Sequence, residues 1–553
     1  MTSDTLAHRK RLRFWGWGNA DEQLAPAEEQ RLGEMARMLS REGFTAVPPP
    51  REDELALPEL PFAIPPGLAP IVSGSRYDRL THAYGKSWAD CVRMCLRALP
   101  AQPLVVAFPR DEQQILDVFD WATREKLAVI PFGGGTSVCG GVEAVGGDDC
   151  RAVVSLDLQY LNRVAEIDPV SRAARIGGGA LGPELEAALR PHALTLRHFP
   201  QSFQFSTLGG WIATRGGGHY ATNHTHIDDF VESVRLLTPR GVMETRRLPG
   251  SGAGPAPERL AIGSEGILGV ITQAWMRVQA RPRFRASASI AFPTMAQACN
   301  AVRTIAQAAL FPANCRLLDA TEALMNGVGQ TPTLVLGFES ADHAVDAWLA
   351  RGLEICREHG GSVAAGPARE ADASDGDAAA TWRSAFLRMP YFRNFLTPLG
   401  VIADTFETAI TWERFEDFHR GVLERVGRAI RETCGHAPVM SCRFTHVYPD
   451  GPAPYFTFYA AGTTNGDLRS ALARWREIKA AANEAVVSLG GTVTHHHAVG
   501  RDHRSGYERE TPALFRGALA SVKQHLDPAG ILNPGVLIDP AGRPLGIRGA
   551  MAR

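Results

Sequence analysis

The sequence predicts an α+β protein with more than one domain, and three observations support this prediction. At 553 residues the chain exceeds the usual size of a single domain. Its first half places a glycine-rich loop and several hairpin patterns between short apolar strands. From about residue 282 the pattern changes to strands that alternate with amphipathic helices. A hydrophobic fraction of 45% and a charged fraction of 21% are typical of a folded, globular chain.

Bulk properties exclude several classes of protein. A formal charge of −1 creates no field that would attract nucleic acid, so we expect no nucleic-acid partner. No stretch has the length of a membrane-spanning helix, and the N-terminus lacks the apolar region of a signal peptide. We therefore expect a cytoplasmic protein, in which the basic run from His8 to Arg13 leaves room for a peripheral membrane contact. The nine scattered cysteines favour reduced thiols over disulfides or a zinc ribbon.

Residues 1–95 predict a helical extension that wraps around the rest of the protein. A charged helical pattern covers residues 22–42, and a proline-rich stretch follows at residues 48–70. Residues 96–281 then form the next predicted domain. It begins with a strand at 104–108, a helix at 111–126 that Asp111 can cap, and a strand at 128–131. Hairpins are expected around Asp168 and around residues 239–241, with a short helix at 181–189.

The loop after the strand at 128–131 predicts a dinucleotide site. Gly133, Gly134 and Gly135 let consecutive backbone N–H groups converge on an anion, because no Cβ stands in the way. A Rossmann loop would lead directly into a helix, whereas this loop leads to another strand at 152–156. This arrangement favours FAD. Further glycine clusters at 177–179, 209–210, 216–218 and 263–266 are expected at strand ends, along an extended ligand.

Residues 282–525 predict a second domain with a ferredoxin-like antiparallel sheet. Strands are expected at 286–292 and 334–339, and helices at 295–309 and 342–359. The turn-rich segment that begins at residue 526 is expected to carry residues 526–553 back to the first domain.

Two motifs in this second domain carry ionisable side chains. His495, His496 and His497 follow a strand pattern at 491–494, so alternation would place His496 on the opposite face and prevent a three-histidine metal site; we expect no metal. Tyr455 shares a strand face with Thr457 and Tyr459, which suits core packing as well as proton transfer. As a base its phenol would need nearby cations, for which the histidines, Arg443 and Arg393 are available.

Five segments together resemble the vanillyl-alcohol-oxidase-type FAD enzymes, and most closely the alkyldihydroxyacetonephosphate synthases among them. They are residues 127–141 (LAVIPFGGGTSVCGG), 203–216 (FQFSTLGGWIATRG), 228–241 (DDFVESVRLLTPRG), 261–272 (AIGSEGILGVIT) and 494–501 (THHHAVGR). The segments at 15–18 (WGWG) and 403–408 (ADTFET) also resemble those synthases. The resemblance implies a two-part FAD-binding domain and a ferredoxin-like cap domain that holds the substrate. It also implies FAD that is not covalently attached, because the glycine loop contains no histidine.

The resemblance also assigns roles to individual residues. It implies catalytic roles for Tyr455, His495, His496, His497 and Arg393, and substrate-binding roles for Arg393, Arg316 and Arg443. Pairing of Arg316 with Asp319 stays open as a purely structural alternative. Two departures from the family pattern are Gln201 before Ser202 and Gly217-Gly218-His219. The residues implied to bind FAD are Pro131, Gly133, Gly134, Gly135, Thr136, Ser137, Ser202, Thr207, Gly209, Gly210, Thr214, Arg215, Glu265, Gly266 and Ile271.

Two activities are compatible with these motifs. The resemblance implies an exchange of the acyl group of acyl-dihydroxyacetone phosphate for a fatty alcohol through an adduct at flavin N5, a step of ether-lipid synthesis. The alternative is oxidation of a 2-hydroxy acid such as D-lactate, glycolate or D-2-hydroxyglutarate, because the ending Asn533-Pro534-Gly535 resembles those enzymes more. Those relatives carry an acidic residue and metal-binding histidines near their His-Gly motif, which we do not find here. We expect a small-molecule or lipid substrate and a homodimer.

Overall fold

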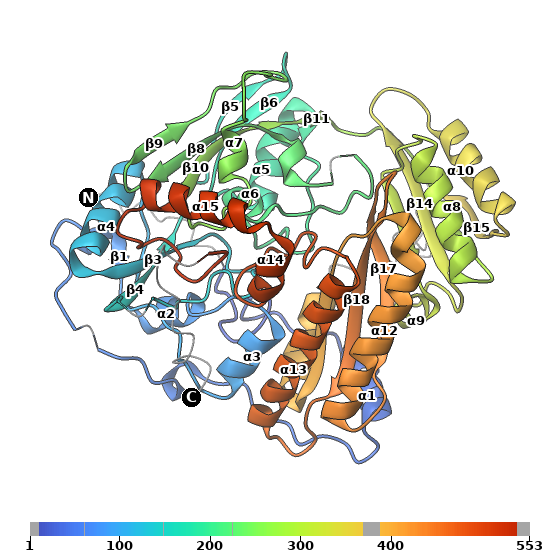
Figure 1. Ribbon diagram of the computed structural model, residues 1–553, viewed down its shortest axis with the longest axis horizontal. Coiled ribbons are helices and arrows are strands. Elements are labelled where there is room, and N and C mark those ends of the chain that lie inside the picture. Colours follow the sequence, from blue (N-terminus) through green and yellow to red (C-terminus); the bar gives the residue numbers. More distant parts are fainter. Residues whose placement is uncertain (1–9, 60, 148, 224, 369–387, 539–553) are drawn as a thin grey trace.

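A computed structural model describes residues 10–59, 61–147, 149–223, 225–368 and 388–538. Residues 8 and 9 of the basic run, and the end of the C-terminal segment from residue 539, lie outside the described residues. Figure 1 shows β1, β3, β4, β5, β6, β8, β9, β10 and β11 on one side of the molecule and β14, β15, β17 and β18 on the other. Among the described helices, none combines the length and the apolarity needed to cross a membrane.

The first sheet has four strands and presents the glycine-rich loop. Its order is β1-β2-β4-β3, in which β2, β4 and β3 are parallel and β1 is antiparallel to β2. Asp111 caps α4 as predicted, since its carboxylate accepts a hydrogen bond of 2.9 Å from the Gln114 N–H. The loop after β3 joins two neighbouring parallel strands and leaves the sheet at its carboxyl edge. The strands are β1 (Val72–Ser73), β2 (Val105–Ala107), β3 (Leu127–Phe132) and β4 (Ala152–Asp157).

The second sheet is antiparallel, with the order β5-β6-β10-β8-β9. Both predicted hairpins are confirmed, as β5–β6 and β8–β9. The expectation that every glycine cluster lies at a strand end holds for residues 177–179, at the end of β6, and is wrong for the other three clusters. Gly209 and Gly210 lie in the first turn of α6 (Leu208–Thr214), residues 216–218 follow that helix, and residues 263–266 follow the short helix Glu258–Ala261. The strands are β5 (Val164–Asp168), β6 (Ala173–Gly177), β8 (Val231–Thr238), β9 (Gly241–Glu244) and β10 (Val270–Arg277), and β7 (Leu194–Thr195) pairs separately with β11 (Gln279–Ala280).

The third sheet has seven antiparallel strands, in the order β15-β12-β14-β13-β17-β18-β16. Its first four strands follow the path β12–α8–β13–β14–α10–β15, with the short helix α9 after β13, so they form a ferredoxin-like unit as predicted. The strands are β12 (Phe284–Ala291), β13 (Asn314–Leu318), β14 (Thr333–Ser340), β15 (Ser362–Ala368), β16 (Val401–Glu407), β17 (Val439–Val447) and β18 (Pro452–Ala461).

The other three strands begin a second unit of the same kind. The path β16–α12–β17–β18–α13 repeats the first unit, and the order β17-β18-β16 matches it, but no strand follows α13 in the described chain. Instead, the segment that carries the histidines lies against the end of β16. The Thr492 N–H donates to the carbonyl of Ala409, and the Thr408 hydroxyl donates to the carbonyl of Thr492 at 2.6 Å. A loop therefore replaces the fourth strand.

Helices cover the sheets and connect the two ends of the chain to them. In Figure 1, α8, α10, α12 and α13 lie along the third sheet, and their apolar faces form one continuous core with it. The N-terminal part crosses to that domain, where the Trp17 N–H donates to Asn394 and the Val47 N–H to the carbonyl of Pro398. The helices not yet given bounds are α1 (Pro26–Leu39), α2 (Arg76–Thr81), α3 (Trp88–Cys95), α4 (Glu112–Glu125), α5 (Gly182–Leu189), α7 (Glu258–Ala261), α8 (Met295–Gln307), α9 (Ala320–Met325), α10 (Asp346–Glu358), α12 (Trp412–Cys434), α13 (Leu468–Ser488), α14 (Arg504–Glu510) and α15 (Ala513–Leu526).

Candidate functional site

The loop after β3 is packed too closely to tolerate side chains at its glycines. A Cβ on Gly134 would lie 1.5 Å from the carbonyl oxygen of Phe205, and one on Gly133 would lie 2.2 Å from the hydroxyl of Thr207. Gly135 has φ +66°, a left-handed conformation that side chains disfavour. A cradle whose space a Cβ would fill fits the predicted role in holding the pyrophosphate of FAD.

One cavity joins this loop to the third sheet. Its lining brings together the N-terminal segment, the glycine loop, the region around α6, the strands β16, β17 and β18, and the histidine segment. Predicted residues that line it are Gly133, Gly134, Gly135, Thr136, Ser137, Ser202, Thr207, Gly210, Thr214, Arg316, Arg393, Arg443, Tyr455, His496 and His497. The loop predicted to hold the cofactor and the residues predicted to carry the chemistry therefore face one space.

The remaining predicted cofactor residues lie behind or beside this cavity. A Cβ on Gly209 would lie 2.8 Å from the carbonyl oxygen of Gly178 and 3.2 Å from that of Ile271, so Gly209 permits a close approach between backbones. Gly266 lies against the ring of Pro131, with a closest approach of 3.0 Å to its virtual Cβ. The Arg215 side chain is largely exposed and pairs with Asp228 at 2.9 Å.

Glu265 joins the two domains instead of opening into the cavity. Its buried carboxylate accepts hydrogen bonds from the N–H groups of Val499 and Gly500, at 2.8 and 2.7 Å. Burial raises the pKa of Glu265 to about 7, although the two N–H donors favour the charged form. The Asn533 side-chain amide donates to the carbonyl of Glu265 at 2.7 Å and to that of Gly141 at 3.0 Å. The C-terminal segment thus fixes both sides of the glycine loop.

Tyr455 lies on β18 and lines the cavity. As predicted from strand alternation, Thr457 and Tyr459 line the same cavity. The hydroxyl of Tyr455 donates to the Thr405 hydroxyl at 3.0 Å. The guanidinium of Arg443 lies 3.9 Å from the centre of the Tyr455 ring and is held there by Glu322 at 2.7 Å. The predicted cation beside the phenol is therefore present, in contact with its ring.

Two further guanidinium groups reach the same cavity. Arg393 donates to the carbonyl of Lys86 at 3.0 Å and lies 3.5 Å from the carboxylate of Asp404. Arg316 donates to the carbonyl of His219 at 2.9 Å. Burial, followed by the positive charge of Arg443, holds the pKa of Arg316 below its usual value. This contact places Arg316 against His219, at one of the two places where the sequence departs from the family pattern.

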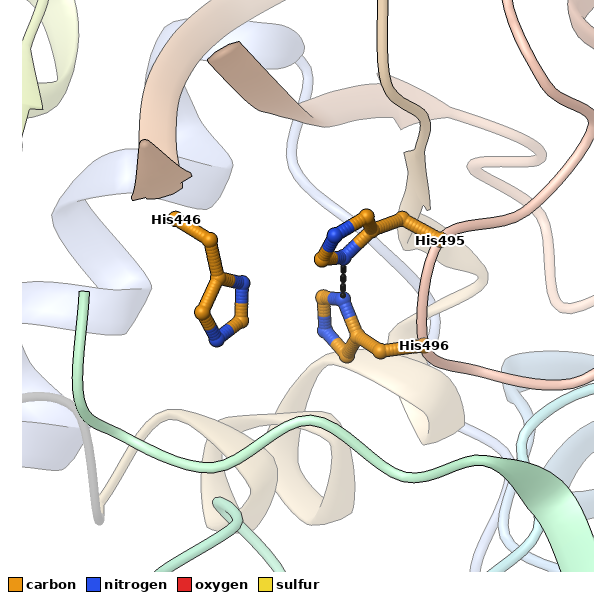
Figure 2. A group of neighbouring side chains, drawn as sticks. All are labelled: His446, His495 and His496. Atoms are coloured by element: carbon orange, nitrogen blue, oxygen red, sulfur yellow. Dashed lines mark hydrogen bonds between the residues drawn. The ribbon is translucent and has the colours of Figure 1, made fainter. Parts of the chain in front are cut away.

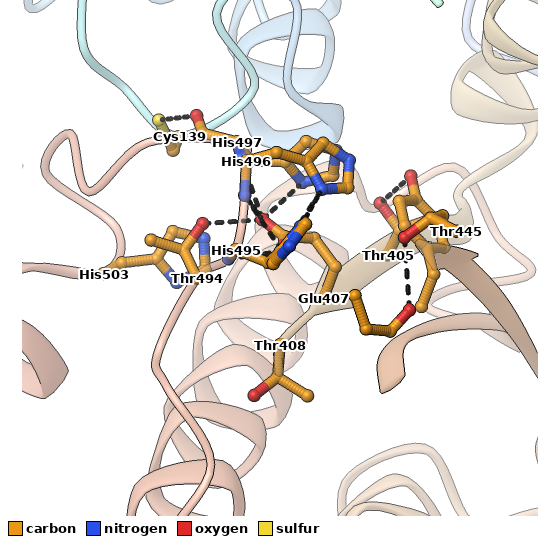
Figure 3. A network of polar contacts seen from close by, with 12 residues as sticks. Cys139, Thr405, Glu407, Thr408, Thr445, Thr494, His495, His496, His497 and His503 are labelled. Carbon is orange, nitrogen blue, oxygen red and sulfur yellow. Dashed lines mark hydrogen bonds and ion pairs between the residues drawn. The ribbon is translucent and has the colours of Figure 1, made fainter. Parts of the chain in front are cut away.

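The histidine segment is organised by one carboxylate that the sequence analysis assigned no role. Figure 3 shows Glu407, at the end of β16, accepting from the Thr494 hydroxyl and from the backbone of the three histidines. Burial opposes its ionisation, but His497, His495, Thr494 and the backbone N–H groups outweigh burial and lower the pKa of Glu407 to about 2. Cys139 of the glycine loop contacts the carbonyl of His497 at 3.1 Å, which connects the segment to the cradle.

The expected alternation of the three histidines is wrong, because residues 491–497 do not form a strand. The backbone curls around Glu407, so the rings of His495 and His496 meet, with their Nδ1 atoms 3.0 Å apart. His446 on β17 completes a cluster in which one ring nitrogen from each residue lies within 4.8 Å of the others (Figure 2). The cluster has the spacing of a three-histidine metal site, although both nitrogens of His495 are already hydrogen-bonded.

Sequence reasoning missed Glu407, Thr405, His446, His226 and Tyr448. Glu407 and Thr405 lie in the segment at 403–408 that was quoted for its resemblance, so a signal was present without a role attached to it. His226 and Tyr448 come from segments far from the histidines, and each lies within hydrogen-bonding distance of His495. No spacing in the sequence predicts such contacts.

Two regions of the chain match models of known protein families. A family model described as "FAD binding domain" matches residues 103–246. A second, described as "FAD linked oxidases, C-terminal domain", matches residues 281–537. Together with the cradle that a Cβ would fill, these matches show that the chain is a flavoprotein that binds FAD.

Individual relatives extend the comparison to most of the chain. An alkyldihydroxyacetonephosphate synthase of Dictyostelium discoideum is 28% identical over 489 residues, which cover 83% of this chain and 77% of the relative. A glycolate oxidase subunit of Bacillus subtilis is 24% identical over 445 residues, covering 79% of this chain and 89% of the subunit. A solved structure of an alkyldihydroxyacetonephosphate synthase shares the fold at a TM-score of 0.76 and 23% identity, covering 94% of this chain and 98% of that one. A solved structure of a p-cresol methylhydroxylase shares the fold at a TM-score of 0.64 and 14% identity, covering 93% of this chain and 98% of that one.

Proposed function

We propose that this chain, which belongs to the vanillyl-alcohol-oxidase-type FAD enzymes, replaces the acyl group of an acyl-dihydroxyacetone phosphate by a fatty alcohol. The reaction releases a fatty acid and leaves an alkyl ether, without net oxidation. The similarity to synthases of this activity covers most of the chain, and the similarity to glycolate oxidase is weaker.

The composition of the cavity carries the proposal. Arg316, Arg393 and Arg443 all line it and supply guanidinium groups that suit a phosphate, although Arg443 is paired with Glu322 and Arg393 lies 3.5 Å from Asp404. Apolar side chains from the N-terminal segment and the helical residues 388–396 also line it. They are Trp17, Met389, Pro390, Phe392 and Leu396. A small 2-hydroxy acid would need the charges but would leave the apolar wall unused, whereas a phosphate ester with a hydrocarbon chain uses both.

The residues of this chain position the substrate and move protons. FAD, when bound in the glycine cradle, supplies the ring nitrogen that activates the reacting carbon. Arg393 and Arg316 hold the phosphate, and the Tyr455 hydroxyl, fixed by Thr405, lies where it can exchange a proton with the substrate. The alcohol loses its hydroxyl proton when its oxygen forms the new bond, so a group in the cavity must take that proton.

Oxidation of a 2-hydroxy acid is the second candidate. The similarity to a glycolate oxidase subunit and to a D-lactate dehydrogenase over 79% of the chain favours it. Incubation with palmitoyl-dihydroxyacetone phosphate and labelled hexadecanol, with mass-spectrometric detection of the ether, separates the two. We expect ether formation without an electron acceptor. Reduction of the flavin by D-lactate, glycolate or D-2-hydroxyglutarate, with no ether formed, would establish the second candidate instead.

The proposal also covers how FAD is attached, how the chain assembles and where it acts. FAD is bound without a covalent bond, so acid precipitation is expected to release it into the supernatant. The chain acts in the cytoplasm as a homodimer and reaches its lipid substrate through peripheral contact with a membrane. Within the described part of the basic run, Arg11 pairs with Glu52 and Arg13 is buried against the carbonyl of Trp17. These two residues therefore contribute little to such a contact.

A further inference from the structure

A row of hydrogen-bonded imidazoles leads away from the cavity. His496, which lines the cavity, has its Nδ1 atom 3.0 Å from Nδ1 of His495 (Figure 2). Nε2 of His495 lies 3.1 Å from Nε2 of His226. Nδ1 of His226 lies 3.2 Å from the carbonyl oxygen of Arg215, and the His226 side chain is half-buried. The row connects the reaction space to the outer part of the molecule.

The carbonyl at the outer end fixes the tautomer of every neutral ring. A carbonyl only accepts, so His226 carries its hydrogen on Nδ1 and its Nε2 accepts. His495 must then donate from Nε2 and accept at Nδ1, which leaves His496 to donate from Nδ1. Nε2 of His496 therefore carries a lone pair, and no described residue forms a hydrogen bond with it. The inner end of the row is a base at the cavity.

The inner rings are held neutral by their surroundings. Burial, together with the neighbouring histidines, keeps the pKa of His495 and of His496 well below the usual value. The carboxylate of Glu407 lies 3.6 Å from Nδ1 of His496, which favours a hydrogen on that nitrogen. A proton that enters the row is therefore not retained on the inner rings.

We propose that His496, His495 and His226 form a proton relay between the cavity and the outside of the protein. When Nε2 of His496 takes the hydroxyl proton of the alcohol, Nδ1 of His496 passes its proton to Nδ1 of His495. Nε2 of His495 in turn passes its proton to Nε2 of His226. His226 then carries two protons and one positive charge, and every inner ring is neutral again with its tautomer reversed. Transfer in the opposite direction makes His496 an acid toward a leaving group.

Tyr448 supports both directions. Its hydroxyl lies 2.8 Å from Nε2 of His495 and 3.3 Å from the hydroxyl of Thr225. When His226 is neutral, the Tyr448 hydroxyl accepts a hydrogen bond from Nε2 of His495. When His226 is protonated on both nitrogens, the Tyr448 hydroxyl donates to Nε2 of His495 instead. Burial raises the pKa of Tyr448 to about 12, so the hydroxyl keeps its proton in both states.

The relay rests on the proposed function only for the source of the proton. The tautomers of the three histidines can be measured without any substrate. The first experiment is NMR of the FAD-loaded protein labelled with ¹⁵N-histidine at pH 8, with the His496 signals assigned by their loss in His496→Gln. We expect His496 to be protonated at Nδ1 and bare at Nε2. A proton on Nε2 of His496 in this resting state would overturn the proposal, whichever reaction the enzyme catalyses.

The second experiment removes the outer end of the row. Because His226 lies outside the cavity lining, His226→Ala should keep FAD and the KM for palmitoyl-dihydroxyacetone phosphate, while kcat falls about 10²-fold, the lower end of a general acid–base contribution. Added imidazole should restore most of the rate by filling the vacated position. The control is His343→Ala, an exposed histidine on the third sheet's side of the molecule, which should change nothing.

Three further outcomes would contradict the relay. A wild-type rate in His226→Ala shows that the proton leaves by another route, and a loss that imidazole does not rescue shows that His226 is only structural. A Co²⁺ titration that gives a tetrahedral spectrum dependent on His446, His495 and His496 shows that these rings hold a metal. If neither proposed substrate reacts, the proposed function fails, while the NMR experiment still decides the relay.

Discussion

Gly134 illustrates how a single missing side chain defines the shape of the glycine loop. The carbonyl of Phe205 occupies the position that a Cβ would take, at 1.5 Å, so any other residue must move one of two backbone segments. Both segments line the cavity or flank residues that do. The glycine is therefore required by the neighbouring backbone, in addition to any requirement of a bound phosphate.

Gly134→Ala is expected to release FAD without unfolding the protein. Displacing the loop costs about 1–3 kcal/mol, which weakens FAD binding by about 5- to 150-fold. The measurement is the FAD content after dialysis, with circular dichroism to verify the fold. Gly517→Ala is the matched control, since a Cβ at Gly517 meets nothing within 4 Å. FAD retained at the wild-type level in Gly134→Ala would show that the loop is not the cradle.

Tyr455→Phe separates packing from chemistry at one position. The substitution keeps the ring beneath Arg443 and removes only the hydroxyl that donates to Thr405. We expect FAD and stability to be unchanged and kcat to fall by about 10²–10⁴, the usual contribution of a general acid or base. Tyr459→Phe on the same strand face is the control, with a small expected effect. A wild-type rate for Tyr455→Phe would mean that Tyr455 only fills space.

Strands and helices with a clear periodicity could be predicted from the sequence, and the histidine segment could not. Helix α4, with its cap at Asp111, and the cavity face of β18 follow from local patterns. The turn at 491–497 depends on Glu407, which lies almost ninety positions away along the chain and accepts four backbone or side-chain donors. Local alternation predicted a strand there because the sequence alone does not reveal that partner.

Replacing Glu407 tests how strongly this one carboxylate fixes the segment. Its folded pKa of about 2 lies below the ordinary value of 4.5, so the charged group stabilises the fold above about pH 4.5. That stability is lost as the pH falls toward 2. At neutral pH the four hydrogen bonds that Glu407 accepts remain, and together they contribute on the order of 1–3 kcal/mol.

Urea unfolding of Glu407→Gln and of the wild-type protein at pH 7 and pH 3 measures this contribution. We expect the variant to be less stable by about 1–3 kcal/mol at pH 7, with a smaller difference at pH 3. Glu510→Gln is the control, because Glu510 also binds this segment, through Thr492 and Val493, but is exposed. We expect it to cost less than about 1 kcal/mol. A difference for Glu407→Gln that does not depend on pH would contradict the assignment.

At the scale of the whole molecule, the cavity exists because segments from nearly the entire chain meet at the glycine loop. Its lining runs from Trp17 to His497. The C-terminal return adds Asn533, whose amide joins the carbonyls of Gly141 and Glu265. Glu265 in turn holds the backbone of Val499 and Gly500, next to the histidines. The glycine loop and the histidine segment are thus fixed to each other through the end of the chain.

Asn533→Asp tests this connection with almost no change in shape. Asn533 is buried, has φ +37° and acts as a donor, and aspartate tolerates the same backbone but cannot donate. Two buried carbonyls lose their partner and face a carboxylate, at a cost on the order of 3 kcal/mol. We expect a lower Tm and weaker FAD binding. The Kd for FAD is measured from flavin fluorescence as FAD is titrated into the protein. In Asn465→Asp, the control, the side-chain oxygen only accepts, from Thr463 and Asp467, so both properties should stay unchanged. If Asn533→Asp lowers Tm but leaves the Kd for FAD at the wild-type value, the C-terminal segment stabilises the fold without fixing the cradle.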